Sequence, residues 1–232
     1  SRAEPSRARP RDLTPLPRCV MQLIVKHETR YRYLTPISES FMELRMQPRT
    51  EANQRCWRFR IETTPRATIL SYRDFLGNLI NHFDIPGRHS RLSIVAESLV
   101  EITPPPPLPA TLPMEAWTEL DEARTEGDHW DMLQPTRLTT SDGLLAALMD
   151  QLELQRDRDP LSTMLALCTS ISRHFEYSPA STAVDSPIDH ALELRQGVCQ
   201  DFAHIMIAAG RSLGIPCRYI SGYLFHRDED HD

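Results

Sequence analysis

Residues 197–204 read Gly-Val-Cys-Gln-Asp-Phe-Ala-His and lead directly into an apolar run that ends in Gly-Ile-Pro at residues 214–216. A glycine that can turn the chain, then a cysteine, then residues with helical periodicity predict that the Cys199 thiol lies in the first turn of a helix. Unpaired backbone N–H groups and the helix dipole at such a position favour a thiolate over a thiol. Cys199 is therefore a candidate nucleophile, and the alternative is a small buried residue at a helix start.

Residues 197–224 resemble the nucleophile segment of the transglutaminase-like superfamily. The likeness lies in the eight residues quoted above, in Arg211, and in the run Gly-Ile-Pro-Cys-Arg-Tyr-Ile-Ser-Gly-Tyr-Leu that starts at residue 214. Residues 21–102 also resemble the β-rich N-terminal region of bacterial members. The resemblance implies a papain-like triad of cysteine, histidine and aspartate, with Cys199 in the place of the nucleophile.

The histidine and aspartate implied by the resemblance have no matching motif after Cys199. The family's histidine lies in a Ser/Thr-His-Ala-Trp type strand and its aspartate in an Asp-Pro type turn, and neither pattern occurs before Asp232. His204 lies five residues after Cys199, roughly 140° around the helix, so we expect it to point away from the thiol. We interpret the chain as C-terminally truncated, with a nucleophile but without its base.

Two alternatives remain open. The chain could be a non-catalytic protein-interaction module, in which the β-rich region binds a partner and the remaining core is a scaffold. It could also be a complete enzyme that recruits His231 as its base. His226 and His231 lie among carboxylates in a charged tail that is more typical of solvated chain than of a metal site. We predict no cofactor and no metal, and no stretch resembles an EF-hand calcium loop.

The chemistry implied by the resemblance is acyl transfer. An imidazole takes the thiol proton, the thiolate attacks an amide carbonyl, and water or an amine resolves the resulting thioester. The backbone N–H of Cys199 is a candidate donor to the oxyanion. Hydrolysis and transamidation share the acyl-enzyme, so the sequence does not separate them. For a bacterial-type member, we expect hydrolysis of a peptide or isopeptide bond in a protein or peptide substrate.

The amino-acid composition limits which classes of partner and which cellular compartment we expect for this protein. The 232 residues suit one large domain or two small ones, and the net charge of −6 gives no case for nucleic acid or an anionic membrane as partner. No stretch of about 20 apolar residues predicts a transmembrane helix. The odd number of widely spaced cysteines favours reduced thiols in a cytoplasmic protein. These cysteines are Cys19, Cys56, Cys168, Cys199 and Cys217.

The first half of the chain is predicted to be a disordered leader followed by a β-rich domain. Residues 1–20 contain five arginines and four prolines without an apolar stretch, which is typical of disorder. Residues 21–103 show a period of two, with Trp57, Phe59 and Ile61 facing one way and the intervening arginines the other. Gly-Asn at residues 77–78 predicts a hairpin. We expect six or seven antiparallel strands in a small sandwich or barrel.

The second half is predicted to be helical. Four consecutive prolines open a linker over residues 104–112, and the period then changes to 3.6 within a core domain at residues 113–232. One helix is expected to begin at Pro160 and to bury Cys168, and another to begin at Cys199. Residues 217–225 are expected to form the first strand of a sheet whose open edge favours self-association. The predicted fold class is α+β, with a β sandwich or barrel before a helical, truncated papain-like core.

Overall fold

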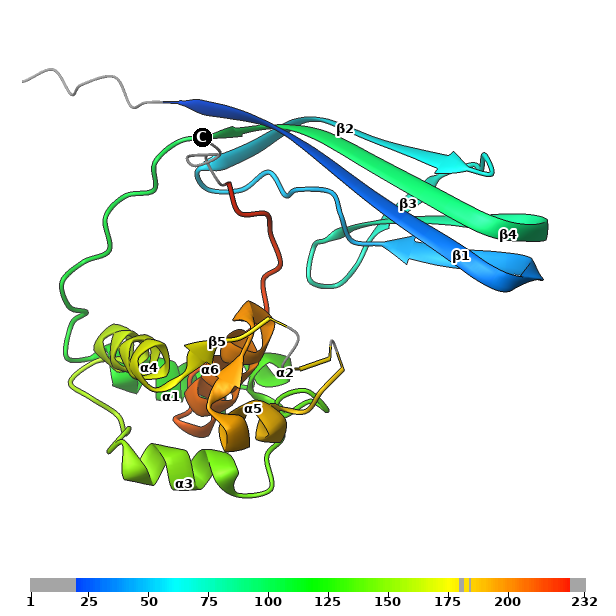
Figure 1. The fold of residues 1–232 in the computed structure, drawn as a ribbon. Helices are drawn as coiled ribbons and strands as arrows, with labels where there is room; N and C mark the ends of the chain where they lie inside the picture. The colour runs from blue at the N-terminus through cyan, green and yellow to red at the C-terminus, as the bar shows by residue number, and fades with distance from the viewer. Residues whose placement is uncertain (1–19, 180–181, 184, 226–232) are drawn as a thin grey trace, which may run out of the picture. The chain divides into compact units, whose positions relative to one another are not determined.

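The computed structural model describes residues 20–179, 182–183 and 185–225, which form two compact units. The first unit contains the chain up to Pro107 together with the segment from Gly222, and the second contains Leu108–Ser221. Figure 1 shows an antiparallel sheet in the first and a group of helices in the second, so the α+β class is confirmed. The predicted leader, apart from Val20, lies outside the described residues, as do His226 and His231.

The first unit is built on one antiparallel sheet of four strands. The strands are β1 (Met21–Leu44), β2 (Gln54–Thr64), β3 (Leu70–Arg73) and β4 (Leu79–Ile102). β4 is central: β1 pairs with it along nearly its whole length on one side, and β3 and β2 pair with successive parts of it on the other. Figure 1 shows β1 and β4 running side by side.

The expected six or seven strands are too many, since the described part of this unit has four. β1 and β4 each continue through a bend instead of ending there. The register of the pair shifts between Arg32 and Glu39, which is the signature of bulges that curve a sheet. Apolar residues from both sides of the bend then share one core. Its buried members on β4 are Phe83, Ile85, Leu92 and Ile94.

The alternation predicted for β2 is correct except at Trp57. Phe59 and Ile61 are partly buried and Arg60 is exposed between them, as a half-buried strand requires. The pairing of β2 with β4 shifts register between Cys56 and Arg58, which places Trp57 at a bulge and leaves it 49% exposed. Trp57 therefore does not lie on the inner face with Phe59.

The predicted hairpin between β3 and β4 is confirmed. Arg73 pairs with Leu79, and the connecting loop contains the predicted Gly-Asn dipeptide. The Asp74 carboxylate accepts hydrogen bonds from the backbone N–H of Asn78 at 2.8 Å and from its side-chain amide at 2.9 Å. This aspartate fixes the turn by bonding to backbone further along the chain.

The second unit consists of six helices and a small parallel pair of strands among its described residues. Its main core cluster joins α3, α4, α5 and α6. The elements are α1 (Ala116–Thr125), α2 (Trp130–Leu133), α3 (Leu144–Gln151), α4 (Pro160–His174), β5 (Glu176–Tyr177), α5 (Ile188–Leu194), β6 (Gln196–Gly197) and α6 (Cys199–Ser212).

Helix α4 begins at the predicted residue but buries a different face. Asp159 caps it by accepting the Ser162 N–H at 2.9 Å, with Pro160 in the first turn. The buried residues are Thr163, Leu167 and Ile171, whereas Cys168 is exposed. The spacing of the apolar residues alone is compatible with either of two overlapping faces of the helix being buried. The polar Thr163 can be buried because its hydroxyl donates to the Asp159 carbonyl at 3.0 Å, four residues before it. The packing of Leu167 and Ile171 in the core clusters decides the face.

The strand predicted at residues 217–225 is wrong within the described chain, where this segment has no ladder partner. A strand requires a neighbouring strand, and at its start this segment instead bonds to helix α2. The Cys217 N–H donates to the Met132 carbonyl at 3.0 Å. After this hydrogen bond, the apolar side chains of Ile220, Leu224 and Phe225 are exposed.

We expect limited proteolysis to test the predicted domain limits, residues 21–103, 104–112 and 113–232. Residues 104–111 are all exposed, while the Thr103 N–H is held by the Asn53 carbonyl at 2.8 Å. A broad-specificity protease should therefore cut first near Leu108 or Ala110, because exposed extended chain enters a protease cleft readily. Mass spectrometry of the early fragments reads this out. Early cuts elsewhere, with residues 104–111 intact, would contradict the proposed limits.

Candidate active site

Cys199 is the first residue of α6, and its thiol is free and exposed. Val198 precedes it in an extended conformation, with φ −108° and ψ 175°, so the chain changes from extended to helical at the cysteine. The predicted position at a helix start is confirmed. The first-turn N–H groups of α6 point toward the same end as the thiol, where developing negative charge is favoured.

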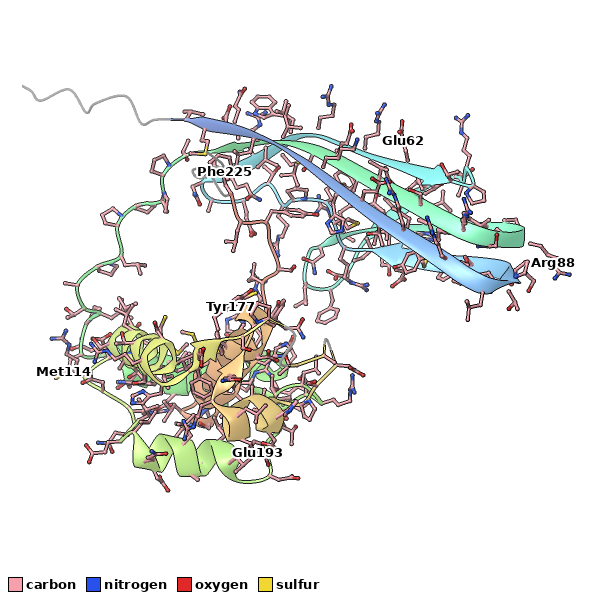
Figure 2. The ribbon with its side chains drawn as sticks, viewed as in Figure 1. Glu62, Arg88, Met114, Tyr177, Glu193 and Phe225 are labelled. Carbon is pink, nitrogen blue, oxygen red and sulfur yellow. The ribbon has the colours of Figure 1, made fainter. Side chains whose placement is uncertain are left out.

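The turn before Cys199 is held by the two-residue strands. Gly197 in β6 pairs with Tyr177 in β5, which is labelled in Figure 2. The Ser178 N–H donates to the Gly197 carbonyl at 2.9 Å, and the Glu176 N–H donates to the Arg195 carbonyl at 2.9 Å. Arg195 has a left-handed conformation, with φ 54°, that turns the chain out of α5. Hydrogen bonds to β5 and to Ser178 therefore hold the residues that immediately precede Cys199.

Asp201 lies in the first turn of α6 and caps it. Its carboxylate accepts the Val198 N–H at 2.8 Å, which satisfies one donor just before the helix. The carboxylate also accepts the Thr182 hydroxyl at 2.6 Å, a contact that no local sequence pattern indicates.

His204 is a core residue. It is 7% exposed, and its ring centroid lies 5.2 Å from that of Tyr219. Burial lowers the pKa of His204, and the charge of Asp201 opposes this effect only in part. This imidazole packs against a tyrosine and makes no bond to Cys199, in agreement with the prediction that it points away from the thiol.

The other histidines of the helical unit give no base for Cys199. His129, His174 and His190 are all exposed, and the His174 ring bonds to the Ser170 carbonyl at 2.8 Å in the last turn of α4. Across the residues that the structure describes, no imidazole is hydrogen-bonded to the Cys199 thiol.

Arg211 fastens the far end of α6. Its guanidinium donates to the carbonyls of Met132 at 2.7 Å, Gln134 at 2.6 Å and Cys217 at 2.8 Å, and to the Thr139 hydroxyl at 3.2 Å. One planar fork of donors thus joins α6 to α2, to the segment that follows α2, and to the segment that follows α6 itself. The sequence placed Arg211 in the family motif but gave no sign of these partners, of which Met132, Gln134 and Thr139 lie more than 70 residues before it in the chain.

The remaining cysteines of the second unit differ from Cys199. Burial raises the pKa of the Cys217 thiol, which makes it a poor nucleophile. Cys168 is exposed like Cys199 but lies well inside α4. The described residues contain no group of three or more His, Cys, Asp or Glu side chains able to hold a metal ion. Among the described helices, none is long and apolar enough to cross a bilayer.

Comparisons with known proteins agree with this architecture. Residues 23–101 match the family model of the bacterial transglutaminase-like N-terminal region, and residues 150–231 match that of the transglutaminase-like superfamily. An uncharacterized protein of Mycobacterium leprae is 34% identical over 200 residues, which cover 86% of this chain and 70% of that protein. The chain belongs to the transglutaminase-like superfamily.

Two further relatives extend the comparison for this transglutaminase-like chain. An uncharacterized protein of Mycobacterium tuberculosis is 31% identical over 207 residues, covering 86% of this chain and 65% of its own length. A crystal structure from Cytophaga hutchinsonii, named "Putative Cysteine Protease", matches with a TM-score of 0.63 and 21% identity over 85% of this chain and 67% of that one. The crystal structure supports the fold.

We expect the stability of this transglutaminase-like chain to fall in mild acid because of His204. Its pKa is lower in the folded state than the ordinary value of about 6.5, so below that pH the unfolded chain binds a proton that the folded chain does not. The free energy of unfolding should therefore be level above about pH 7 and fall as the pH drops through about 6. Urea denaturation across this range measures it.

The substitution His204→Phe should remove part of that acid-side slope while keeping an aromatic ring against Tyr219. His190→Phe is the matched control, because it makes the same substitution at an exposed histidine of the same unit. An identical pH slope in the wild type and His204→Phe would show that His204 does not titrate as its burial predicts.

Proposed function

We propose that this chain carries the nucleophile of a thiol enzyme that hydrolyses or transfers acyl groups from peptide or isopeptide amides through a Cys199 thioester. The observation that supports it is a free, exposed thiol at the first residue of α6, inside the segment that matches the transglutaminase-like superfamily. Helix starts are where thiolates are stabilised and where oxyanions find backbone donors.

The proposed reaction proceeds in two steps. The Cys199 sulfur bonds to the amide carbonyl carbon, and the negative oxygen of the tetrahedral intermediate accepts the Cys199 N–H, a contact worth on the order of 3 kcal/mol. The amine then leaves with the proton that an imidazole took from the thiol, which gives a thioester. Water attacks the thioester, the acid departs, and the proton returns to sulfur. An amine in place of water would give transamidation.

We place the imidazole base and its orienting aspartate outside the described residues. His204 is buried against Tyr219, and the exposed His129, His174 and His190 are not bonded to Cys199. The chain also spans only 65% to 70% of its mycobacterial relatives. We therefore propose that residues 1–232 hold the nucleophile half of the site and have little activity alone. The scheme needs no cofactor.

The proposed substrate is a protein or peptide in the cytoplasm. An amide carbonyl carried on an extended chain can reach an exposed thiol at a helix end, and the four described cysteines are all free thiols. Free thiols persist in a reducing compartment. Hydrolysis is our first choice over transamidation, following the likeness to bacterial-type members.

A non-catalytic interaction module is the second candidate. Large apolar side chains are exposed on the first unit, including Phe41 at 66% and Phe75 at 87%. Exposed aromatic rings of this kind mark protein-binding surfaces when they gather in a patch. Leu224 and Phe225 are similarly exposed, and Figure 2 labels Phe225. Under this second candidate function, the segment that contains Leu224 and Phe225 could also mediate self-association.

We expect Cys199 to react with iodoacetamide faster than the other thiols. Cys168 is the matched control because it is also exposed but lies within a helix, so the comparison tests the effect of the helix start. Cys56 and Cys217 should react more slowly still, since burial raises the pKa of both. Peptide mass spectrometry at several pH values gives the order. Equal rates at Cys199 and Cys168 would remove the case for an activated thiol.

We expect amide hydrolysis by residues 1–232 to be slower by about 10³-fold or more than by a version extended through the next strands of the parent protein. Losing triad members commonly costs that much in rate. Peptide-amide hydrolysis and amine incorporation, each with Cys199→Ala as the blank, measure it. If the short chain matches the longer one and His231→Ala abolishes its activity, then His231 is the base. If neither form is active, the result favours the proposal that the chain is a non-catalytic interaction module.

A further inference from the structure

Asp201 is buried two residues beyond Cys199, with 2% of its surface exposed. A carboxylate is removed from water at such a site only when hydrogen bonds replace its solvation. Two donors do so at the same oxygen: the Val198 N–H at 2.8 Å and the Thr182 hydroxyl at 2.6 Å. Both distances are those of charge-assisted bonds, which are stronger and more directional than neutral ones.

Gly197 packs directly on this carboxylate. A Cβ atom at residue 197 would lie 2.9 Å from the Asp201 Cβ and 3.0 Å from Oδ2, closer than real side-chain contacts. On its other side, the Gly197 carbonyl accepts the Ser178 N–H. The backbone just before Cys199 is thus held between the β5 strand and the Asp201 side chain, and only glycine fits there.

Thr182 brings a third segment to the same point. It belongs to the connection between β5 and α5, 19 positions before Asp201 in the sequence. Its hydroxyl fixes the orientation of the carboxylate, which otherwise could turn about its own side chain while still meeting the Val198 N–H. Two independent donors therefore define where the carboxylate lies, and the carboxylate in turn defines where residues 197–198 lie.

We propose that Asp201 is a positioning residue for Cys199 and that Thr182 is the residue that holds its carboxylate in place. The inference rests on the proposed function of Cys199. Asp201 is not placed to touch a reacting atom, because its carboxylate is bonded to Val198 and Thr182. Its contribution is therefore geometric: it sets the direction of the Cys199 N–H and Sγ at the start of α6.

The geometric role matters because acyl transfer tolerates little displacement. A shift of about 1 Å in a reacting group can cost about 100-fold in rate. Without the Thr182 hydroxyl, the Asp201 carboxylate keeps a single described donor, Val198, and the turn before Cys199 gains freedom. We therefore expect the maximal rate to fall while the affinity for substrate stays the same.

The test uses Thr182→Val, which removes the hydroxyl at constant shape, and Thr182→Ser, which restores a donor. Asp201→Ala is less informative because it removes the helix cap as well. Thr169→Val is the matched control, since the Thr169 hydroxyl donates to the Leu165 carbonyl at 2.8 Å on the exposed side of α4. The readouts are Cys199 alkylation at saturating pH, kcat and KM for peptide-amide hydrolysis by the longest active form, and the melting temperature.

We expect Thr182→Val to lower both the alkylation rate and kcat by about tenfold with KM unchanged. Thr182→Ser should recover most of this loss, and Thr169→Val should match the wild type. The proposal would be overturned if Thr182→Val had the same alkylation rate and the same kcat as the wild type, whatever its melting temperature. If the wild type cleaves no amide, the proposed function fails, and the alkylation rates alone still decide whether Thr182 and Asp201 position the thiol.

Discussion

The burial of the Asp201 carboxylate against Gly197 is the contact on which the candidate site depends. It brings the start of α6, the β5–β6 pair and the connection that contains Thr182 to one point. Cys199 is exposed at this junction while everything behind it is fixed. A nucleophile needs this combination, because the thiol must be accessible to a substrate and its backbone N–H must keep one direction. Arg211 holds the other end of the same helix.

Features that depend on residues close in sequence were predictable. A glycine, a cysteine and a helical pattern fixed the start of α6, and an Asp-Pro pair fixed the start of α4. The same holds for the β3–β4 hairpin. Features that depend on distant partners were not predictable. Cys168 fitted a plausible apolar face, and only the packing of Leu167 and Ile171 against other helices shows that it is exposed.

The site divides along the same line. The position of Cys199 could be inferred from one short motif, whereas Thr182 and the segments bound by Arg211 are brought to the site by the fold. Trp57 shows where sequence-based prediction of the sheet fails. The alternation of residues predicted that its ring faces inward, but a one-residue bulge moves the ring off the inner face. Membership of the transglutaminase-like superfamily and the exposed helix-start thiol together support acyl transfer at Cys199.

Trapping of the acyl-enzyme tests the central claim most directly. A peptide p-nitrophenyl ester is the suitable acyl donor, because its good leaving group lets a thiolate react with little help from a base. After an acid quench, peptide mapping should find one acyl group on Cys199 that hydroxylamine removes, and Cys199→Ser should carry none. Acylation of Cys168 as readily as of Cys199, or a Cys199 that stays unmodified while ester is consumed, would contradict the claim.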